Sequence, residues 1–184
     1  MSKLTDKSPQ SHHQSLQDKP EQKRKTKSAS DKKQKDMLLP KKELSAEQRK
    51  WMVEYVYDIV GFAHDVCRQL PCGLPEYIYQ EAFFTTLSNH HITAHKEWMF
   101  HPLFNGQPLQ SYLKMDFMIE REQGNIIIET KAIEELTNRE RAQLFGYMAG
   151  TSFPFGLLIN FATYPKPQIE RYFFDKKDMT LTAF

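Results

Sequence analysis

The chain has 184 residues, which is enough for one domain of ordinary size and a tail. It contains no run of about 18 apolar residues, which argues against a transmembrane helix, and its first residues, MSKLTDKSPQSHHQ, lack the apolar core of a secretory signal. Acids recur through this segment, so it is also a poor match to an acid-poor transit peptide. We therefore expect an intracellular protein without a membrane partner.

Charge is divided unevenly along the chain. Residues 1–43 carry 12 Lys and Arg against 6 Asp and Glu, a net +6, whereas residues 44–184 carry 13 against 17, a net −4. The first segment is rich in Lys, Gln and Ser and almost lacks aromatic and β-branched residues. Because it cannot bury enough apolar area to offset the entropy of ordering, we predict a disordered basic tail over 1–43 and a folded domain over 44–184.

Two basic clusters leave the role of this tail open. They are KRKTK at 23–27 and KKQK at 32–35. Such clusters are typical of a nuclear address, with a cytoplasmic location otherwise, or of an arm that contacts phosphates. The tail could equally dock a protein partner or be a solvated segment without a dedicated partner. Met37 is an alternative start that would leave most of the tail untranslated.

The two cysteines, Cys67 and Cys72, are spaced neither as a CxxC redox pair nor as zinc ligands, so we expect two free thiols. No glycine-rich phosphate loop of the Walker type and no Ser/His/Asp arrangement is legible. The cysteines and the absence of these motifs therefore give no support to redox, zinc, nucleotide-binding or serine-hydrolase chemistry.

Helical signals open the folded part. Apolar residues recur at helical spacing over 46–70, and Ser45 with Gln48 forms a capping-box pattern at its start. LPCGLP interrupts the pattern, and Pro75 suits the first turn of a second helix over about 75–89.

Three segments then read as strands joined by tight turns. They span residues 91–104, 109–120 and 125–133. Asn105-Gly106 separates the first two and residues 122–124 the second pair, so we expect hairpins.

The pattern changes again towards the end of the chain. Thr137 and Glu140 form a capping box that opens a helix to about Gly150. Strands at 155–161 and 169–174 follow, the second being the last. The order helix, helix, three strands, helix, strand, strand predicts a mixed α/β layer domain with helices on the sheet.

Two acids and a lysine stand where burial should be deep. In IIIETK at 126–131, Glu129 and Lys131 share one face of the strand and Thr130 takes the other. Asp116 lies in the apolar run of the preceding strand, and a hairpin centred near residue 123 puts it opposite about residue 130. A bulge or longer turn moves this by one or two residues, so Asp116 and Glu129 are expected to be cross-strand neighbours.

This pairing predicts a metal site. Adjacent carboxylates repel each other and pay for desolvation, and a divalent cation removes the repulsion. Carboxylate oxygens are the ligands that Mg²⁺ prefers, and Lys131 beside them would hold a phosphate or orient a water. The alternative is a Lys–Glu pair on a solvated face of the sheet.

The segment GLPEYIYQEAF contains Gly73-x-x-Glu76-x-x-Tyr79. With it, the chain resembles the GxxExxY proteins, a branch of the PD-(D/E)XK nuclease superfamily, over about residues 56–174. Five motifs stand in the family's order: GxxExxY, MDFMI, IIIETKAIEEL, Gln143-x-x-x-Tyr147 and GLLINF. The resemblance implies a PD-(D/E)XK core, a mixed β-sheet flanked by helices in the order αβββαβ.

The resemblance also implies a role for each matching residue. Asp116 and Glu129 would be the principal ligands of Mg²⁺, with Mn²⁺ as a substitute, and Glu76 would reach the metal directly or through water. Lys131 would be the catalytic lysine, and Gln143 and Tyr147 would line the site. Thr130 departs from the apolar residue common there and should be harmless, because it faces away. Alternatively, Glu76 is an exposed helix acid stabilised by the helix dipole, and the Gln143–Tyr147 pair merely edges an amphipathic helix.

The implied function is Mg²⁺-dependent hydrolysis of phosphodiester bonds in nucleic acid, with DNA as the expected substrate. The net charge of −4 on the folded part is unusual for a duplex binder, although the tail could supply phosphate contacts. The alternative is an inactive nuclease-fold module that binds nucleic acid or protein partners in a larger assembly.

Overall fold

The computed structural model describes residues 42–184. The disorder predicted for the tail falls on residues outside this range, except for its last two positions. Of these, Lys42 donates hydrogen bonds to Asp175 and Asp178, both at 2.9 Å. No helix within residues 42–184 is long and apolar enough to cross a membrane.

The described chain alternates between helices and strands along its length. In chain order the elements are α2 (Ala46–Tyr55), α3 (Tyr57–Gln69), α4 (Glu76–Asn89), β1 (Ala94–Phe100), β2 (Leu103–Phe104), β3 (Gln107–Pro108), β4 (Leu113–Ile119), β5 (Ile126–Lys131), α5 (Asn138–Thr151), β6 (Phe155–Asn160), β7 (Gln168–Asp175) and β8 (Thr180–Ala183).

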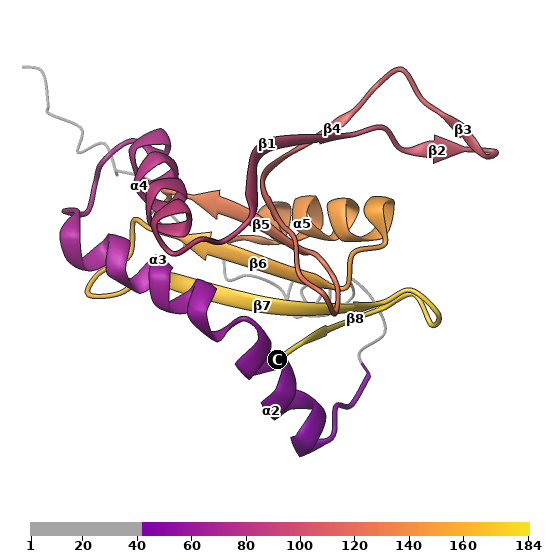
Figure 1. The fold of residues 1–184 in the computed structure, drawn as a ribbon, viewed down its shortest axis with the longest axis horizontal. Coiled ribbons are helices and arrows are strands. Elements are labelled where there is room, and N and C mark those ends of the chain that lie inside the picture. Colours follow the sequence, from indigo (N-terminus) through magenta and orange to yellow (C-terminus); the bar gives the residue numbers. More distant parts are fainter. Residues whose placement is uncertain (1–41) are drawn as a thin grey trace, which may run out of the picture.

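The strands form a six-stranded sheet in the order β1-β4-β5-β6-β7-β8. Only β5 and β6 pair in parallel within it, and the other neighbours are antiparallel. Alternate residues of β5 face opposite sides, since Ile126 and Ile128 pack with α3 and α4 whereas Ile127 packs with α5. Helices therefore cover both faces (Figure 1), and the predicted mixed α/β layer is confirmed.

Both capping boxes are present as predicted, one at Ser45 and one at Thr137. The single helix predicted over 46–70 is wrong, because the chain leaves helical geometry at Val56 (φ −106°, ψ 6°). Tertiary contacts explain the break. Tyr55 donates a hydrogen bond to the Gly124 carbonyl at 2.8 Å and packs on Phe155 with ring centroids 4.6 Å apart, so α2 turns towards the start of β6.

Two further predictions need correction or refinement. The strand predicted at 169–174 is not the last, because β8 follows and pairs antiparallel with β7. The predicted Asn105-Gly106 turn is present, with positive φ at both residues (50° and 77°), and it joins β2 to β3. Both cysteines are free thiols, as expected.

The paired strands β1 and β4 change direction at Asp116. Met115 packs in the core on the α5 side, whereas Phe117, two residues on, packs on the side of α3 and α4. Residues two apart in a regular strand face the same way, so the pair is bent here. Glu97, which the register places level with Asp116, has a φ of 54°. Beyond the paired ends of β1 and β4, residues 101–112 extend from the sheet as an arm that carries β2 and β3 (Figure 1).

Candidate active site at the end of β5

The acids and the lysine singled out in the sequence come from three elements that meet at the carboxyl end of β5. Glu129 and Lys131 are among the last three residues of this strand, and Asp116 lies at the bend of the adjacent β4. Glu76 is the first residue of α4. The charges of Asp116, Glu76 and Lys131 all affect the pKa of Glu129, so the four charged groups form one cluster.

Glu129 and Lys131 form a buried ion pair. Lys131 Nζ donates to Glu129 Oε1 at 2.5 Å, and the side chains are 16% and 2% exposed. The alternative of a pair on a solvated face of the sheet is therefore wrong. Glu129 Oε2 is buried and has no hydrogen-bond partner. Because an unpartnered buried carboxylate oxygen is costly, this atom is suited to bind a cation.

The protonation of this pair follows from its surroundings. Burial raises the pKa of Glu129 to about 7, and the negative charge of Asp116 adds to the effect against the opposing influence of Lys131. Burial alone would lower the pKa of Lys131, but the hydrogen bond and charge of Glu129 outweigh it, so the pKa of Lys131 is raised. Lys131 therefore stays charged at neutral pH.

Asp116 is held by the strand beside it. Its Oδ2 accepts hydrogen bonds from Thr130 N at 2.8 Å and from Thr130 Oγ1 at 2.7 Å. The pairing of Phe117 with Ile128, continued by one residue, brings Asp116 level with Glu129. This is one residue from the predicted partner and within the range expected for the turn.

Glu76 reaches the same strand end from α4. Its Oε2 accepts from Ala132 N at 3.2 Å, and its Oε1 accepts from Gln80 Nε2 at 3.2 Å. Glu76 is therefore not a free surface acid of the helix. Burial raises the pKa of Glu76, and the charge of Lys131 opposes this shift.

Thr130 connects Asp116 with α4, a role that the sequence did not lead us to expect. Its side chain does lie on the face opposite to Glu129, but Gln80 Nε2 donates to Thr130 Oγ1 at 3.0 Å while the same hydroxyl donates to Asp116. A chain of hydrogen bonds thus runs from Glu76 through Gln80 and Thr130 to Asp116. The available signal was a hydroxyl directly between Glu129 and Lys131 in a buried strand.

The GxxExxY segment positions Glu76. Gly73 has a φ of 89°, which favours glycine. The Tyr79 hydroxyl donates to Pro71 O at 2.7 Å and accepts from Leu74 N at 3.3 Å, while its ring stacks on Phe161 at 5.3 Å. Tyr79 therefore anchors the loop that leads into Glu76, and its predicted place in the core is confirmed.

Gln143 and Tyr147 approach from α5, on the face towards which Glu129 and Lys131 point. Gln143 Nε2 donates to the Tyr147 hydroxyl at 2.8 Å. Burial raises the pKa of Tyr147, and the charges of Glu129 and Asp116 contribute to the rise. Tyr147 thus lies within electrostatic reach of the acids, with Gln143 at the exposed edge of the same helix.

Asn160, at the end of β6, was not predicted as part of the site. It is fully buried beside Lys131 in the parallel register. Its Oδ1 accepts from Ile133 N at 3.1 Å and from Ala162 N at 3.2 Å, and its Nδ2 donates to Ile133 O at 2.7 Å. This side chain ties down the segment that follows Lys131. The sequence signal for this role was the single amide side chain, Asn160, within the apolar run FGLLINF.

The donor set fits a metal held by few protein ligands. Among residues 42–184, no group of three or more His, Cys, Asp or Glu side chains has the arrangement of a complete metal site. Mg²⁺ is usually bound through one or two carboxylates, with water and phosphate oxygens filling the other positions. Asp116 and the unpartnered oxygen of Glu129 match this requirement.

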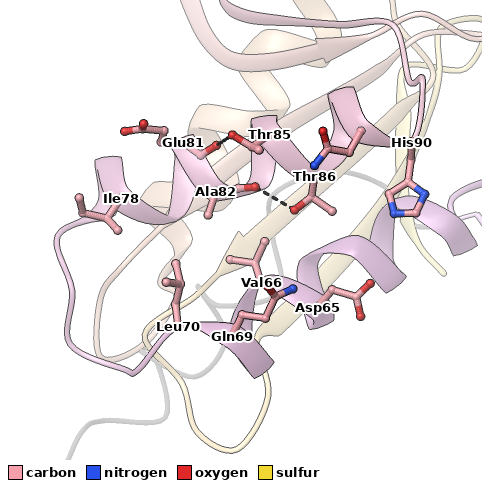
Figure 2. Close-up of a pocket in the computed structure, with 11 residues that line it drawn as sticks. Asp65, Val66, Gln69, Leu70, Ile78, Glu81, Ala82, Thr85, Thr86 and His90 are labelled. Atoms are coloured by element: carbon pink, nitrogen blue, oxygen red, sulfur yellow. Dashed lines mark hydrogen bonds between the residues drawn. The ribbon is translucent and has the colours of Figure 1, made fainter.

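A separate hollow of about 560 Å³ lies between α3 and α4 (Figure 2). Its lining includes Leu70, Ile78 and Ala82, and the Thr86 hydroxyl donates to the Ala82 carbonyl at 2.9 Å. None of the charged residues of the candidate site borders it. The hollow is therefore distinct from the site at the end of β5.

The fold and the sequence define the class of the protein. Residues 53–172 match the family model described as the PD-(D/E)XK nuclease superfamily. The chain belongs to this superfamily, whose members are in general nucleases, and its mixed sheet flanked by helices is consistent with that fold.

A solved structure titled "Crystal structure of SSO0001" is similar to this chain at 18% sequence identity and a TM-score of 0.43. The match covers 70% of this chain and 65% of that chain. No curated protein matches this chain.

Proposed function

We propose that this protein is a metal-dependent nuclease that hydrolyses phosphodiester bonds in nucleic acid, with DNA as the expected substrate. The observation that supports this most directly is the buried Glu129 carboxylate. One of its oxygens is bound to Lys131 and the other has no partner, and Asp116 lies on the adjacent strand. A structural ion pair alone does not account for the unpartnered oxygen or for a second acid in the same cluster.

In this proposal Asp116 and Glu129 hold Mg²⁺, or Mn²⁺ as a substitute, and Glu76 reaches the ion directly or through water. When bound, the ion supplies Lewis-acid polarisation of the scissile phosphate and activation of water. Lys131, kept charged by the surrounding acids, stabilises negative charge on the phosphate or orients the attacking water.

The remaining residues position these groups. Thr130 holds one oxygen of Asp116 through two hydrogen bonds, which leaves the orientation of that carboxylate little freedom. Gln143 and Tyr147 offer an amide and a hydroxyl at the α5 side of the site.

We further propose that the chain is a member of the GxxExxY branch of the superfamily. Gly73 turns the loop, Tyr79 anchors it and Glu76 is thereby directed to the end of β5. This gives each of the three motif residues a physical role.

The test is cleavage of single-stranded DNA, duplex DNA and RNA in Mg²⁺, Mn²⁺ or EDTA. Asp116→Ala and Glu129→Ala should abolish both metal binding, measured by calorimetry, and cleavage. Lys131→Ala should retain metal binding but reduce the rate by about 100-fold or more. Glu54→Ala, which removes an exposed acid on α2, is the matched control and should behave as wild type.

Two results would contradict the proposal. If the folded wild type cuts no substrate with any metal, the chain is better explained as an inactive nuclease-fold module that binds nucleic acid or protein partners. If Asp116→Ala or Glu129→Ala unfolds the metal-free chain, as judged by circular dichroism, the acids are structural partners.

A further inference from the structure

The described part of the molecule carries no excess of positive charge with which to hold a duplex. The net charge of residues 44–184 is −4. Two of the basic residues on elements that bear the site are already paired with acids, Lys114 with Glu97 at 2.8 Å and Arg141 with Glu170. Duplex binding depends heavily on Lys and Arg contacts to phosphates. The net charge of this part of the chain thus favours a ligand that is held by more than phosphate contacts.

Exposed aromatic side chains lie on two of the elements that carry candidate site residues, or directly beside them in the sequence. Tyr77 follows Glu76 in the first turn of α4 and is 62% exposed. Tyr112 immediately precedes β4, the strand that carries Asp116, and is 54% exposed. Exposed aromatic rings are the groups on which the bases of a single strand stack.

The helix geometry directs Tyr77 towards β4. Residues seven apart lie on nearly the same face of an α-helix, and Phe84, seven residues after Tyr77, stacks on Phe117 with centroids 6.3 Å apart. Phe117 is the neighbour of Asp116 in β4. A different set of α4 residues, including Ile78 and Ala82, faces α3 (Figure 2). Tyr77 therefore lies on the side of α4 that faces the strand carrying Asp116.

The strand geometry places Tyr112 on the side of β4 away from α5. Leu113 and Met115 pack on the α5 side, so the alternate positions Tyr112 and Lys114 point the other way. The pairing of Phe100 with Leu113 puts His101 level with Tyr112, and their rings meet edge-on at 5.9 Å. This contact helps to hold the Tyr112 ring in place at the base of the arm.

The arm that continues from Tyr112 has the same chemical character. Residues 101–112 contain no Asp, Glu, Lys or Arg. Leu103 and Phe104, in β2, are each 66% exposed. An uncharged arm with exposed apolar and aromatic side chains suits contact with bases better than contact with a phosphate backbone.

We propose that the site takes a single-stranded nucleic acid, whose bases stack on Tyr77 at the α4 side and on Tyr112 at the base of the arm. This rests on the proposed function, since the stacked bases flank the phosphate presented to Asp116 and Glu129. DNA and RNA single strands offer the same ring faces, so both belong to the proposed class of ligand.

Binding is tested separately from cleavage. Fluorescein-labelled single-stranded DNA, single-stranded RNA and duplex DNA of one sequence are titrated by anisotropy with full-length protein, in EDTA and with Ca²⁺ in place of Mg²⁺. At equal salt, a single strand should bind at least about tenfold more tightly than the duplex. Tyr77→Ala and Tyr112→Ala should each weaken single-strand binding by about tenfold, as expected for the loss of one stacked base.

Matched variants separate stacking from a structural role. Tyr77→Phe and Tyr112→Phe keep the ring and should bind within about twofold of wild type. Tyr57→Ala removes another exposed tyrosine, on α3 and 73% exposed, and should have no effect. A 2-aminopurine base in the oligonucleotide should change its fluorescence with wild type and with the Phe variants but not with the double Ala variant. Unchanged melting temperatures show that all variants fold.

The inference is overturned if the duplex binds as tightly as both single strands, if the Ala variants bind like wild type, or if no oligonucleotide binds. Cleavage decides the proposed function independently. If the wild type cuts duplex DNA but neither binds nor cuts single strands, the proposed nuclease function stands and single-strand recognition is refuted. If single strands bind through the tyrosines but no substrate is cut, single-strand recognition stands and the proposed nuclease function is refuted.

Discussion

Glu129 has two oxygens with different surroundings in a buried position. One accepts a hydrogen bond from Lys131, and the other has no partner. Without a cation, the charged form of this carboxyl is disfavoured by burial and by the nearby charge of Asp116. The same features that suit it to bind a metal therefore make the metal-free protein sensitive to pH.

The raised pKa of Glu129 predicts that the metal-free protein becomes less stable as the pH rises. The ordinary pKa of 4.5 applies to the unfolded chain and a pKa of about 7 to the folded chain, so the folded state binds the proton more tightly between these values. The stabilisation is fully present below pH 4.5 and is lost as the pH rises through 7. It corresponds to about 3 kcal/mol at 1.36 kcal/mol per pKa unit.

Urea unfolding in EDTA across this pH range measures the effect. Glu129→Gln removes the titrating group but keeps an acceptor for Lys131, so the fall in the free energy of unfolding should flatten and the variant should exceed wild type at alkaline pH. Adding Mg²⁺ should stabilise wild type but not the variant. A variant that keeps the wild-type slope would assign the pH dependence to another group.

At the scale of elements, the link through Thr130 holds α4, β4 and β5 in register. Gln80 of α4 and Asp116 of β4 both bond to the Thr130 hydroxyl of β5. The bend in β4 at Asp116 and the anchored loop before Glu76 bring their acids to the same strand end. The position of each acid thus depends on contacts made by a neighbouring element.

Thr130→Val tests this link, because valine keeps the shape and β-branching of threonine without the hydroxyl. Asp116 keeps the hydrogen bond from the Thr130 backbone amide but loses the second, so we expect metal affinity to fall by about tenfold. Calorimetric titration with Mn²⁺ measures the change.

Thr85→Val is the control for this substitution. The Thr85 hydroxyl is exposed and bonds only locally, to the Glu81 carbonyl of its own helix. It should leave metal affinity unchanged. Equal affinities of Thr130→Val and wild type would show that the Thr130 hydroxyl has no part in placing Asp116.

At the scale of the whole molecule, positive and negative charge are separated along the chain. The first 43 residues carry +6 and the remainder −4. If the tail contacts phosphates while the folded part contributes the site and the stacking rings, the two parts add different terms to nucleic-acid affinity. The electrostatic term is sensitive to salt, and the stacking term is much less so.

Deletion of residues 1–41 separates the two terms. The deletion retains Lys42, whose bonds to Asp175 and Asp178 belong to the folded part. Single-strand affinity should weaken, and the plot of log affinity against log salt should become shallower, because fewer phosphates are neutralised. Tyr112→Ala should instead weaken binding without changing the slope. An unchanged slope after deletion would show that the tail does not contact nucleic acid.

The sequence by itself determined the features that depend on near neighbours. The capping boxes at Ser45 and Thr137 need only residues three apart, and the alternation of IIIETK places Glu129 and Lys131 together on one face. The Asn105-Gly106 turn is likewise local, since it depends on residues that tolerate positive φ. These local signals were sufficient for the mixed α/β class and for the order of the elements, except for the break at Val56 and the added strand β8.

The tertiary structure alone decided the features that join distant parts of the chain. The break at Val56 depends on a contact between Tyr55 and a carbonyl 69 residues away, and the bond from Gln80 to Thr130 spans 50 residues. The bend at Asp116 places adjacent stretches of β4 against different helices. No local periodicity encodes these contacts, because their energy comes from burial and hydrogen bonding that exist only once the sheet and its helices have packed.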